Sequence, residues 1–151
     1  MSRALPLLLS VVLAGCGLLS RTVPAEQQRS EAALATVFAV AAAPEAGPAE
    51  LAPLVVANGG DAARRWRAPA DTARPAEIAS VRELAGTIQA TLADVSRGGQ
   101  FSYRVEEFVL EPGDEGPWHV LRARFEDPGQ TEFEASFLPV DGRLLLGRFE
   151  R

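Results

Sequence analysis

The 151-residue chain has one histidine and one cysteine, so few of its side chains can act as a nucleophile or carry a proton near neutral pH. His119 follows Trp118 and the acidic pair Asp114-Glu115. A histidine beside a carboxylate can act as a general base inside a pocket. This arrangement predicts a small-pocket isomerase or hydrolase, with Tyr103, Trp118 and His119 lining the pocket.

The residues around His119 also permit a purely structural role. Strict alternation places His119 on the same strand face as Leu121 and Phe125, which is the apolar face. Asp114-Glu115 lies in a predicted turn, so no carboxylate partner is defined. We favour the structural role and assign no catalytic residue.

Glutamates in the predicted strands are candidates for an acid/base pair or a calcium site. They are Glu106, Glu107, Glu132 and Glu134. Adjacent strand residues face opposite ways, and polar residues that alternate with apolar ones are typical of a solvated sheet face. Neighbouring predicted strands carry Arg104, Arg122 and Arg124. We therefore expect cross-strand ion pairs rather than a metal site.

The segment Arg64-Arg65-Trp66-Arg67 places three guanidinium groups around one indole. Such a segment suits contact with anionic lipid headgroups, or a binding hot spot for a protein partner. The alternative is one helical turn with Trp66 in the core and the arginines outside, and this is the interpretation we favour.

Composition excludes several classes of function. The chain carries 15 arginines and no lysine against 20 acidic residues, giving a net charge of −5 and a pI near 4.9. This balance argues against nucleic acid as a partner, since phosphate binding needs a basic field. One cysteine and one histidine exclude a disulfide framework and a Cys/His zinc cage. We expect no cofactor and no metal.

The N-terminal residues carry the most specific motif. After Arg3, residues 4–13 are apolar, and the small residues Ala14 and Gly15 precede Cys16. This is the layout of a secretory signal, and the apolar stretch is too short to span a bilayer.

Residues Leu13, Ala14, Gly15 and Cys16 resemble the bacterial lipobox. The resemblance implies a signal peptide over residues 1–15, removal of it before Cys16, and acylation of Cys16. Residues 16–24 would then form a lipidated tether. Gly17 stands where an aspartate often retains Gram-negative lipoproteins in the inner membrane, so the resemblance implies the periplasmic face of the outer membrane.

Helices are predicted first in the remaining chain, residues 25–151, which we expect to form one domain. Residues 25–43 are alanine-rich and end at Pro44, and residues 49–57 predict a shorter helix. Asp61 can cap a further turn or two. Residues 75–95 carry one apolar stripe at intervals of three and four, with Asp71 or Thr72 as the cap.

Strands follow the helices. Alternation over residues 101–106, 118–126, 131–140 and 143–149 predicts four antiparallel strands. The turns between them are rich in Pro, Gly and Asp, and Asp141-Gly142 is a preferred hairpin turn. The predicted fold is α+β, with N-terminal helices packed on a curved, cone-like, four-stranded meander.

This element order, with Gly-Pro-Trp-His-Val (116–120) opening the second strand, resembles the nuclear transport factor 2-like, or cystatin-like, domains. The resemblance rests on the order of elements and carries over no catalytic residue. Such domains include enzymes, ligand pockets and interaction modules, so fold alone does not assign a function. We expect a non-catalytic envelope lipoprotein that binds a protein partner or a small apolar ligand.

Overall fold

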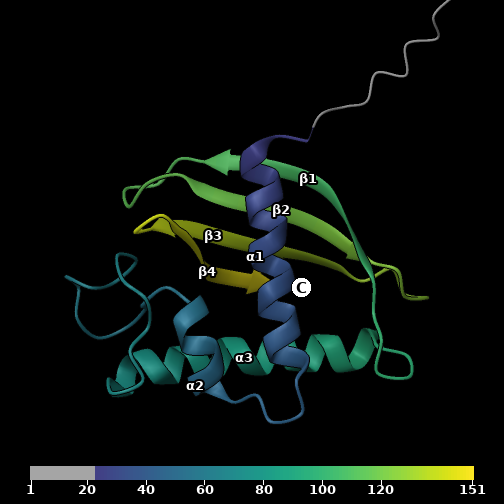
Figure 1. Cartoon of the computed structure of the whole chain (residues 1–151), viewed down its shortest axis with the longest axis horizontal. Helices are drawn as coiled ribbons and strands as arrows, with labels where there is room; N and C mark the ends of the chain where they lie inside the picture. Colours follow the sequence, from purple (N-terminus) through teal and green to yellow (C-terminus); the bar gives the residue numbers. More distant parts are fainter. Residues whose placement is uncertain (1–22) are drawn as a thin grey trace, which may run out of the picture.

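The computed structural model describes residues 23–151 and has the predicted α+β architecture (Figure 1). Helices come first in the chain, and a four-stranded antiparallel sheet of order β1-β2-β3-β4 follows. The sheet is an open meander whose two edge strands, β1 and β4, do not pair with each other. The predicted fold class is confirmed.

The long helices form where the sequence predicts them. α1 spans Ala25–Ala42 and α3 spans Pro75–Val95. Proline fits the first turn of α3 because that position needs no backbone donor. The predicted caps of α3, Asp71 and Thr72, are wrong: the cap position is Arg74, and the Asp71 carboxylate accepts instead from the Ala73 amide in the turn before it.

The segment between these helices is less helical than predicted. α2 covers only Pro48–Leu51, and the 3₁₀ turn η1 covers Ala52–Leu54. Beyond Leu54 the chain is extended, and β-branched Val55 and Val56 form isolated bridges to Leu146 and Pro69.

Residues 61–67 make turns and no regular helix. Asp61 does accept from the Ala63 amide as a cap would. The turn cannot propagate as a helix, because Trp66 adopts a left-handed conformation with φ of 63°.

The four strands are joined in the predicted order. They span Tyr103–Glu111 (β1), Trp118–Phe125 (β2), Glu132–Val140 (β3) and Arg143–Glu150 (β4). β1 runs further than the predicted 101–106, because a bulge between Val105 and Glu107 interrupts the alternation. A second irregularity pairs Ser136 with Arg148 and Phe137 with Leu146, so Gly147 is the extra residue of β4.

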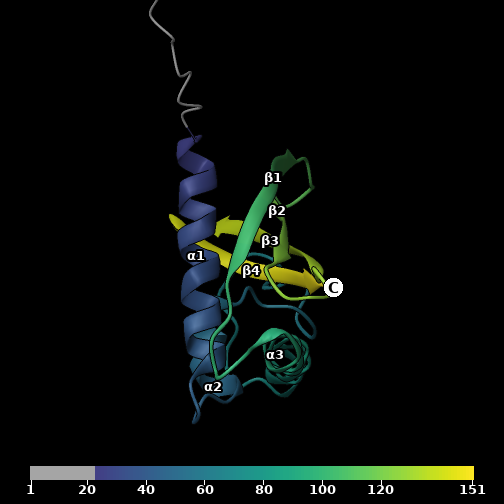
Figure 2. The ribbon, with the colours of Figure 1, turned by 90° about the vertical axis from the view of Figure 1, so that its right-hand side faces the viewer.

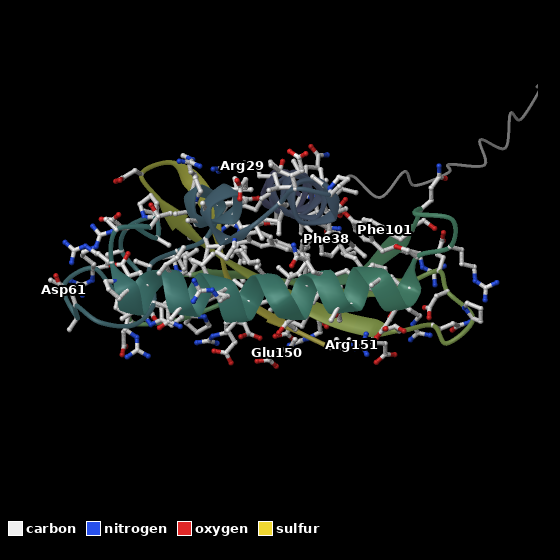
Figure 3. All side chains as sticks on the ribbon, turned by 90° about the horizontal axis from the view of Figure 1, so that it is seen from below. Arg29, Phe38, Asp61, Phe101, Glu150 and Arg151 are labelled. Atoms are coloured by element: carbon white, nitrogen blue, oxygen red, sulfur yellow. The ribbon has the colours of Figure 1, made fainter. Side chains whose placement is uncertain are left out.

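α1 crosses one face of the sheet, and α3 lies along the β4 side (Figures 1 and 2). The side chains between these three parts form what we call the inner core, and Figure 3 shows them filling the space between α1 and α3. Its large members include Leu34, Val37, Phe38, Val81, Ile88, Leu92, Leu121, Phe125, Phe133, Phe137, Leu146 and Phe149. Phe38 lies within 5.9 Å, between ring centroids, of each of five other aromatic rings.

A smaller apolar group lies on the other face of the sheet. We call it the outer cluster: Val56, Trp118, Val120, Leu138, Val140 and Leu145, with Trp66 packed against it. Trp66 meets Trp118 edge to face at 5.3 Å. Residues 55–70 therefore cover one end of a face whose other end carries charged side chains.

Candidate functional site

His119 is part of the packing between β2 and α1. Its side chain is 5% exposed, and its Nδ1 atom lies 3.2 Å from the Ser30 hydroxyl on α1. That hydroxyl donates to the Glu26 carbonyl at 2.8 Å, so it accepts from Nδ1–H of His119. Burial lowers the pKa of His119, and the nearby charge of Arg29 lowers it further while Glu26 opposes the shift. The neutral imidazole is thus held as a structural hydrogen-bond donor.

The three predicted pocket residues do not come together. Trp118 faces the outer cluster, whereas His119 and Tyr103 face α1. Tyr103 pairs with Phe125 at the far end of β2 and stacks edge to face on Phe38. These three side chains therefore do not line one pocket, because alternation sends the neighbouring strand residues Trp118 and His119 to opposite faces of the sheet.

The carboxylates predicted to assist His119 lie elsewhere. Asp114 is exposed and Glu115 half-buried in the β1–β2 turn, and neither bonds to the imidazole. The surface hollows described below are lined by other residues. His119 therefore lacks both the partner and the opening to solvent that a general base needs.

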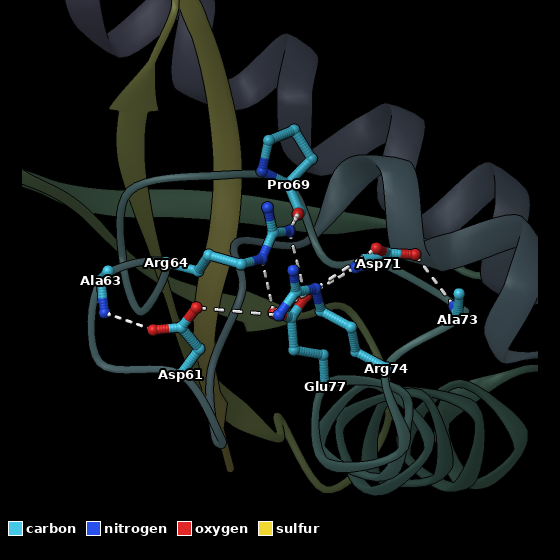
Figure 4. A network of polar contacts seen from close by, with 8 residues as sticks. All are labelled: Asp61, Ala63, Arg64, Pro69, Asp71, Ala73, Arg74 and Glu77. Atoms are coloured by element: carbon cyan, nitrogen blue, oxygen red, sulfur yellow. Dashed lines mark hydrogen bonds and ion pairs between the residues drawn. The ribbon is translucent and has the colours of Figure 1, made fainter.

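The arginines of residues 64–67 divide between two environments. Arg64 turns inward, and its Nε donates to the Glu77 carboxylate at 2.8 Å while its Nη2 donates to the Pro69 carbonyl at 3.0 Å (Figure 4). Arg65 and Arg67 stay exposed on either side of half-buried Trp66. Of the three arginines, only Arg65 and Arg67 are therefore free of bonds to Glu77, and Arg64 is engaged in holding this segment to α3.

Glu77, in the first turn of α3, is a buried acid that sequence reasoning missed. It is 1% exposed and accepts from Arg64 and from the Asp71 amide at 2.7 Å. The hydrogen bond from Arg64 is the main reason that its pKa is lowered, and burial opposes the shift. Glu77 thus fastens residues 61–71 to α3. An acid in a first turn is common at helix starts, so the sequence contains no signal that this one is buried.

The charged end of the outer sheet face is a network of ion pairs. Arg122 bonds to Glu107 at 2.7 Å and to Glu134 at 2.9 Å, and these contacts raise its pKa. Arg124 bonds to Glu132 at 2.6 Å. Glu106 takes part through Arg104 and Arg124. An open hollow of about 530 Å³ lies over this network. The four glutamates singled out in the sequence, Glu106, Glu107, Glu132 and Glu134, each have a guanidinium partner, as expected for a solvated face.

An apolar groove runs along the exposed side of α1. It measures about 880 Å³ and is lined mainly by small side chains: Ala35, Thr36, Ala39, Val40, Ala43 and Ala46, with Glu45 and Glu50. A second hollow, of about 310 Å³, lies between α1 and the turn joining β3 to β4. Both are open to solvent.

Within residues 23–151 no group of three or more His, Cys, Asp and Glu side chains is placed to hold a metal ion. In the same part of the chain, no helix combines the length and apolarity that crossing a bilayer requires. The predicted signal peptide and Leu13–Cys16 motif lie outside the described residues.

No protein-family model, curated protein or solved structure matches the chain. The resemblance to cone-shaped, nuclear transport factor 2-like domains and the lipobox assignment therefore stay predictions made from the sequence.

Proposed function

We propose that this protein is a bacterial lipoprotein, anchored through acylated Cys16 at the periplasmic face of the outer membrane, whose α+β domain is a non-catalytic binding module. Its partner would be an envelope protein or a small apolar ligand held on the domain surface. The motif Leu13–Cys16 is the observation that supports the anchor, and the apolar groove on α1 is the observation that supports the binding role.

The observation that favours binding over catalysis is the use made of the buried ionisable groups. His119 bonds to Ser30, and Glu77 bonds to Arg64 and to a backbone amide. Both groups are engaged in holding elements together, whereas the open surface of α1 presents apolar side chains to solvent. A surface of this kind suits a partner that brings its own apolar side chains.

The position of the tether supports a location close to the membrane. α1 begins at Ala25, so the nine residues of 16–24 connect the lipid to the domain. At roughly 3.3 Å per residue this connection reaches at most about 30 Å. Several acyl chains on Cys16 would hold the domain stably, since each buried methylene contributes about 0.8 kcal/mol.

Lipid labelling of the full chain in a Gram-negative host tests the anchor. Cells are fed an alkyne analogue of palmitate, and we expect the wild-type protein to carry the label and to sediment with outer membranes. Cys16→Ser should abolish the label. A label that survives Cys16→Ser would contradict the anchor. Gly17→Asp is the matched control for location, and we expect it to keep the label and move the protein to the inner membrane.

Site-directed photo-crosslinking tests the binding role. A photoreactive side chain replaces Ala39 in the groove, and in a second variant it replaces Glu132 on the charged face of the sheet. We expect a discrete adduct from position 39 and none from position 132. Equal adducts from both positions, or turnover of ester or sugar substrates that His119→Gln abolishes, would count against a groove-based binding module.

A further inference from the structure

Two arginines, Arg29 on α1 and Arg143 at the start of β4, belong neither to the inner core nor to the ion-pair network. Arg29 lies one turn into α1, and its Nη2 donates to the Gly142 carbonyl at 3.3 Å. Arg143 opens β4, and its Nη2 donates to the Pro53 carbonyl at 3.0 Å. These bonds bring the two guanidinium groups to the same hollow, between α1 and the β3–β4 turn. Figure 3 places Arg29 on the outer side of α1, away from Phe38 and α3.

Both guanidinium groups lack a carboxylate partner among residues 23–151. The ion pairs of that part of the chain involve other arginines: Arg64, Arg74, Arg104, Arg122, Arg124 and Arg151. A guanidinium has five N–H donors, and Arg29 and Arg143 each use one of them on a backbone carbonyl. In a chain with more acids than bases, two such cations at one hollow form a local positive site.

The hollow between them is apolar. Its remaining lining comes from Ala32, Ala33, Thr36, Val37, Leu54, Gly142 and Leu144, and it includes no acidic side chain. Its volume of about 310 Å³ is at the lower end of the range for small-molecule sites. Cations at the rim of an apolar hollow suit a ligand that joins an anionic head to a hydrocarbon part.

One wall of the hollow is formed by α1, the helix that follows the proposed tether. Arg29 is four residues from the start of α1, where the chain from Cys16 enters the domain. Arg29 therefore lies within the reach of the tether from the lipid surface.

We propose that this hollow binds the headgroup of an anionic phospholipid in the membrane that holds the anchor. Arg29 and Arg143 donate to the lipid phosphate, and the apolar lining contacts the glycerol and first acyl carbons. The proposal rests on the proposed anchor for its proximity argument. It assigns the lipid contact to the start of α1 rather than to the segment Arg64-Arg65-Trp66-Arg67.

Arginine-specific labelling of the wild-type full chain tests this assignment. The protein is placed in nanodiscs of phosphatidylcholine alone, or of phosphatidylcholine with about 30 mol % phosphatidylglycerol. Both preparations are treated with a glyoxal reagent, and mass spectrometry gives a modification rate for each arginine. We expect Arg29 and Arg143 to react several-fold more slowly in the anionic discs, and the difference to shrink at high salt. Arg65 and Arg67, both exposed, serve as internal controls whose rates should be the same in both discs.

Matched variants sharpen the test. Each basic residue near an anionic surface adds roughly fivefold in affinity, so Arg29→Gln and Arg143→Gln should each weaken association with anionic discs by about that factor. The double variant Arg65→Gln/Arg67→Gln should leave association unchanged. Thermal unfolding of each variant checks that its fold is intact. The labelling experiment uses the wild-type chain alone, so it decides the proposal even if a variant fails to fold.

Several outcomes would overturn the proposal. Equal rates for Arg29 and Arg143 in the two discs would do so, as would protection of Arg65 and Arg67 instead. Protection by free decanoate, with none from anionic discs, would assign the hollow to a soluble amphiphile. A chain that does not co-purify with neutral discs counts against the anchor alone, because the arginine rates with added anionic discs still decide the headgroup contact.

Discussion

The inner core and the outer cluster are built in different ways on the two faces of one sheet. The inner core is filled by residues that recur at regular spacing along α1, α3 and the strands, and rings from several elements meet at Phe38. The outer cluster depends on an irregular segment, residues 55–70, that is fastened to α3 by one buried ion pair. Regular elements thus supply redundant contacts, while the covering segment relies on a few specific ones.

Phe38→Ala should produce the largest loss of stability. The side chain is 1% exposed and contacts rings from β1, β2, β3 and β4, so its removal leaves a cavity in the inner core. We expect a decrease of about 3–5 kcal/mol in the free energy of unfolding, measured by urea denaturation. Ala39→Ser, on the exposed side of the same helix, is the control and should change little. A loss below about 1 kcal/mol for Phe38→Ala would mean that the inner core is not close-packed.

Glu77→Ala should release the segment that covers the outer cluster. We expect a loss of about 2–3 kcal/mol, since Glu77 is buried while its partner Arg64 can turn to solvent. Hydrogen exchange should rise first at the Ala57 and Trp66 amides, which bond within this segment. Because Arg64 lowers the pKa of Glu77, the stabilisation is present above the ordinary glutamate pKa and is lost as pH falls through the lowered value. The exposed Glu83→Ala serves as control; uniform exchange changes across the inner core would contradict this local role.

Gly147→Ala should disturb the outer cluster from the strand side. A Cβ at this position would lie 2.5 Å from the Trp118 ring and 3.3 Å from Val56. We expect a loss of about 1–3 kcal/mol and a shifted tryptophan emission spectrum. Gly86→Ala on α3 is the matched glycine control: a Cβ there meets nothing within 4 Å, so a gain of about 0.5–1 kcal/mol is expected. Equal effects at the two glycines would show that Trp118 does not rest on β4.

Titration of His119 should give the smallest effect. Burial lowers its pKa, so the unfolded chain binds more protons than the folded one between the ordinary pKa of about 6.5 and the lowered value. Stability should therefore fall as pH drops through this window and level off below it. His119→Gln should remove this part of the pH dependence of unfolding. Retention of the same pH dependence in the variant would assign the titration to another group.

Regular periodicity explains why most of the fold was predictable. The stripe of α3, including Val81, Ile88 and Leu92, repeats at helical spacing and is buried as predicted. Asp141-Gly142 makes the expected tight turn, with both residues at positive φ. These signals are local in sequence, so one chain is enough to read them.

The features that the sequence did not predict depend on contacts between distant residues or on an irregularity in strand pairing. Trp66 and Trp118 are 52 positions apart and meet only because residues 55–70 fold over the outer face. The Arg29 and Arg143 hollow joins a helix start to a turn 113 residues away from it. The bulge after Val105 shifted the alternation, so the second half of β1 was missed. No spacing within one element encodes such contacts.

α1 joins the N-terminal chain at one end and carries Phe38 in its fourth turn. A pull on the start of α1 would therefore act on the inner core directly. α1 crosses the strands, so extracting it would have to shear Phe38 from rings on all four strands at once (Figure 1). Resistance to such a load is set by the rate of unfolding rather than by equilibrium stability. If the protein is tethered as proposed, the same packing that fills the core would also resist a mechanical load on α1.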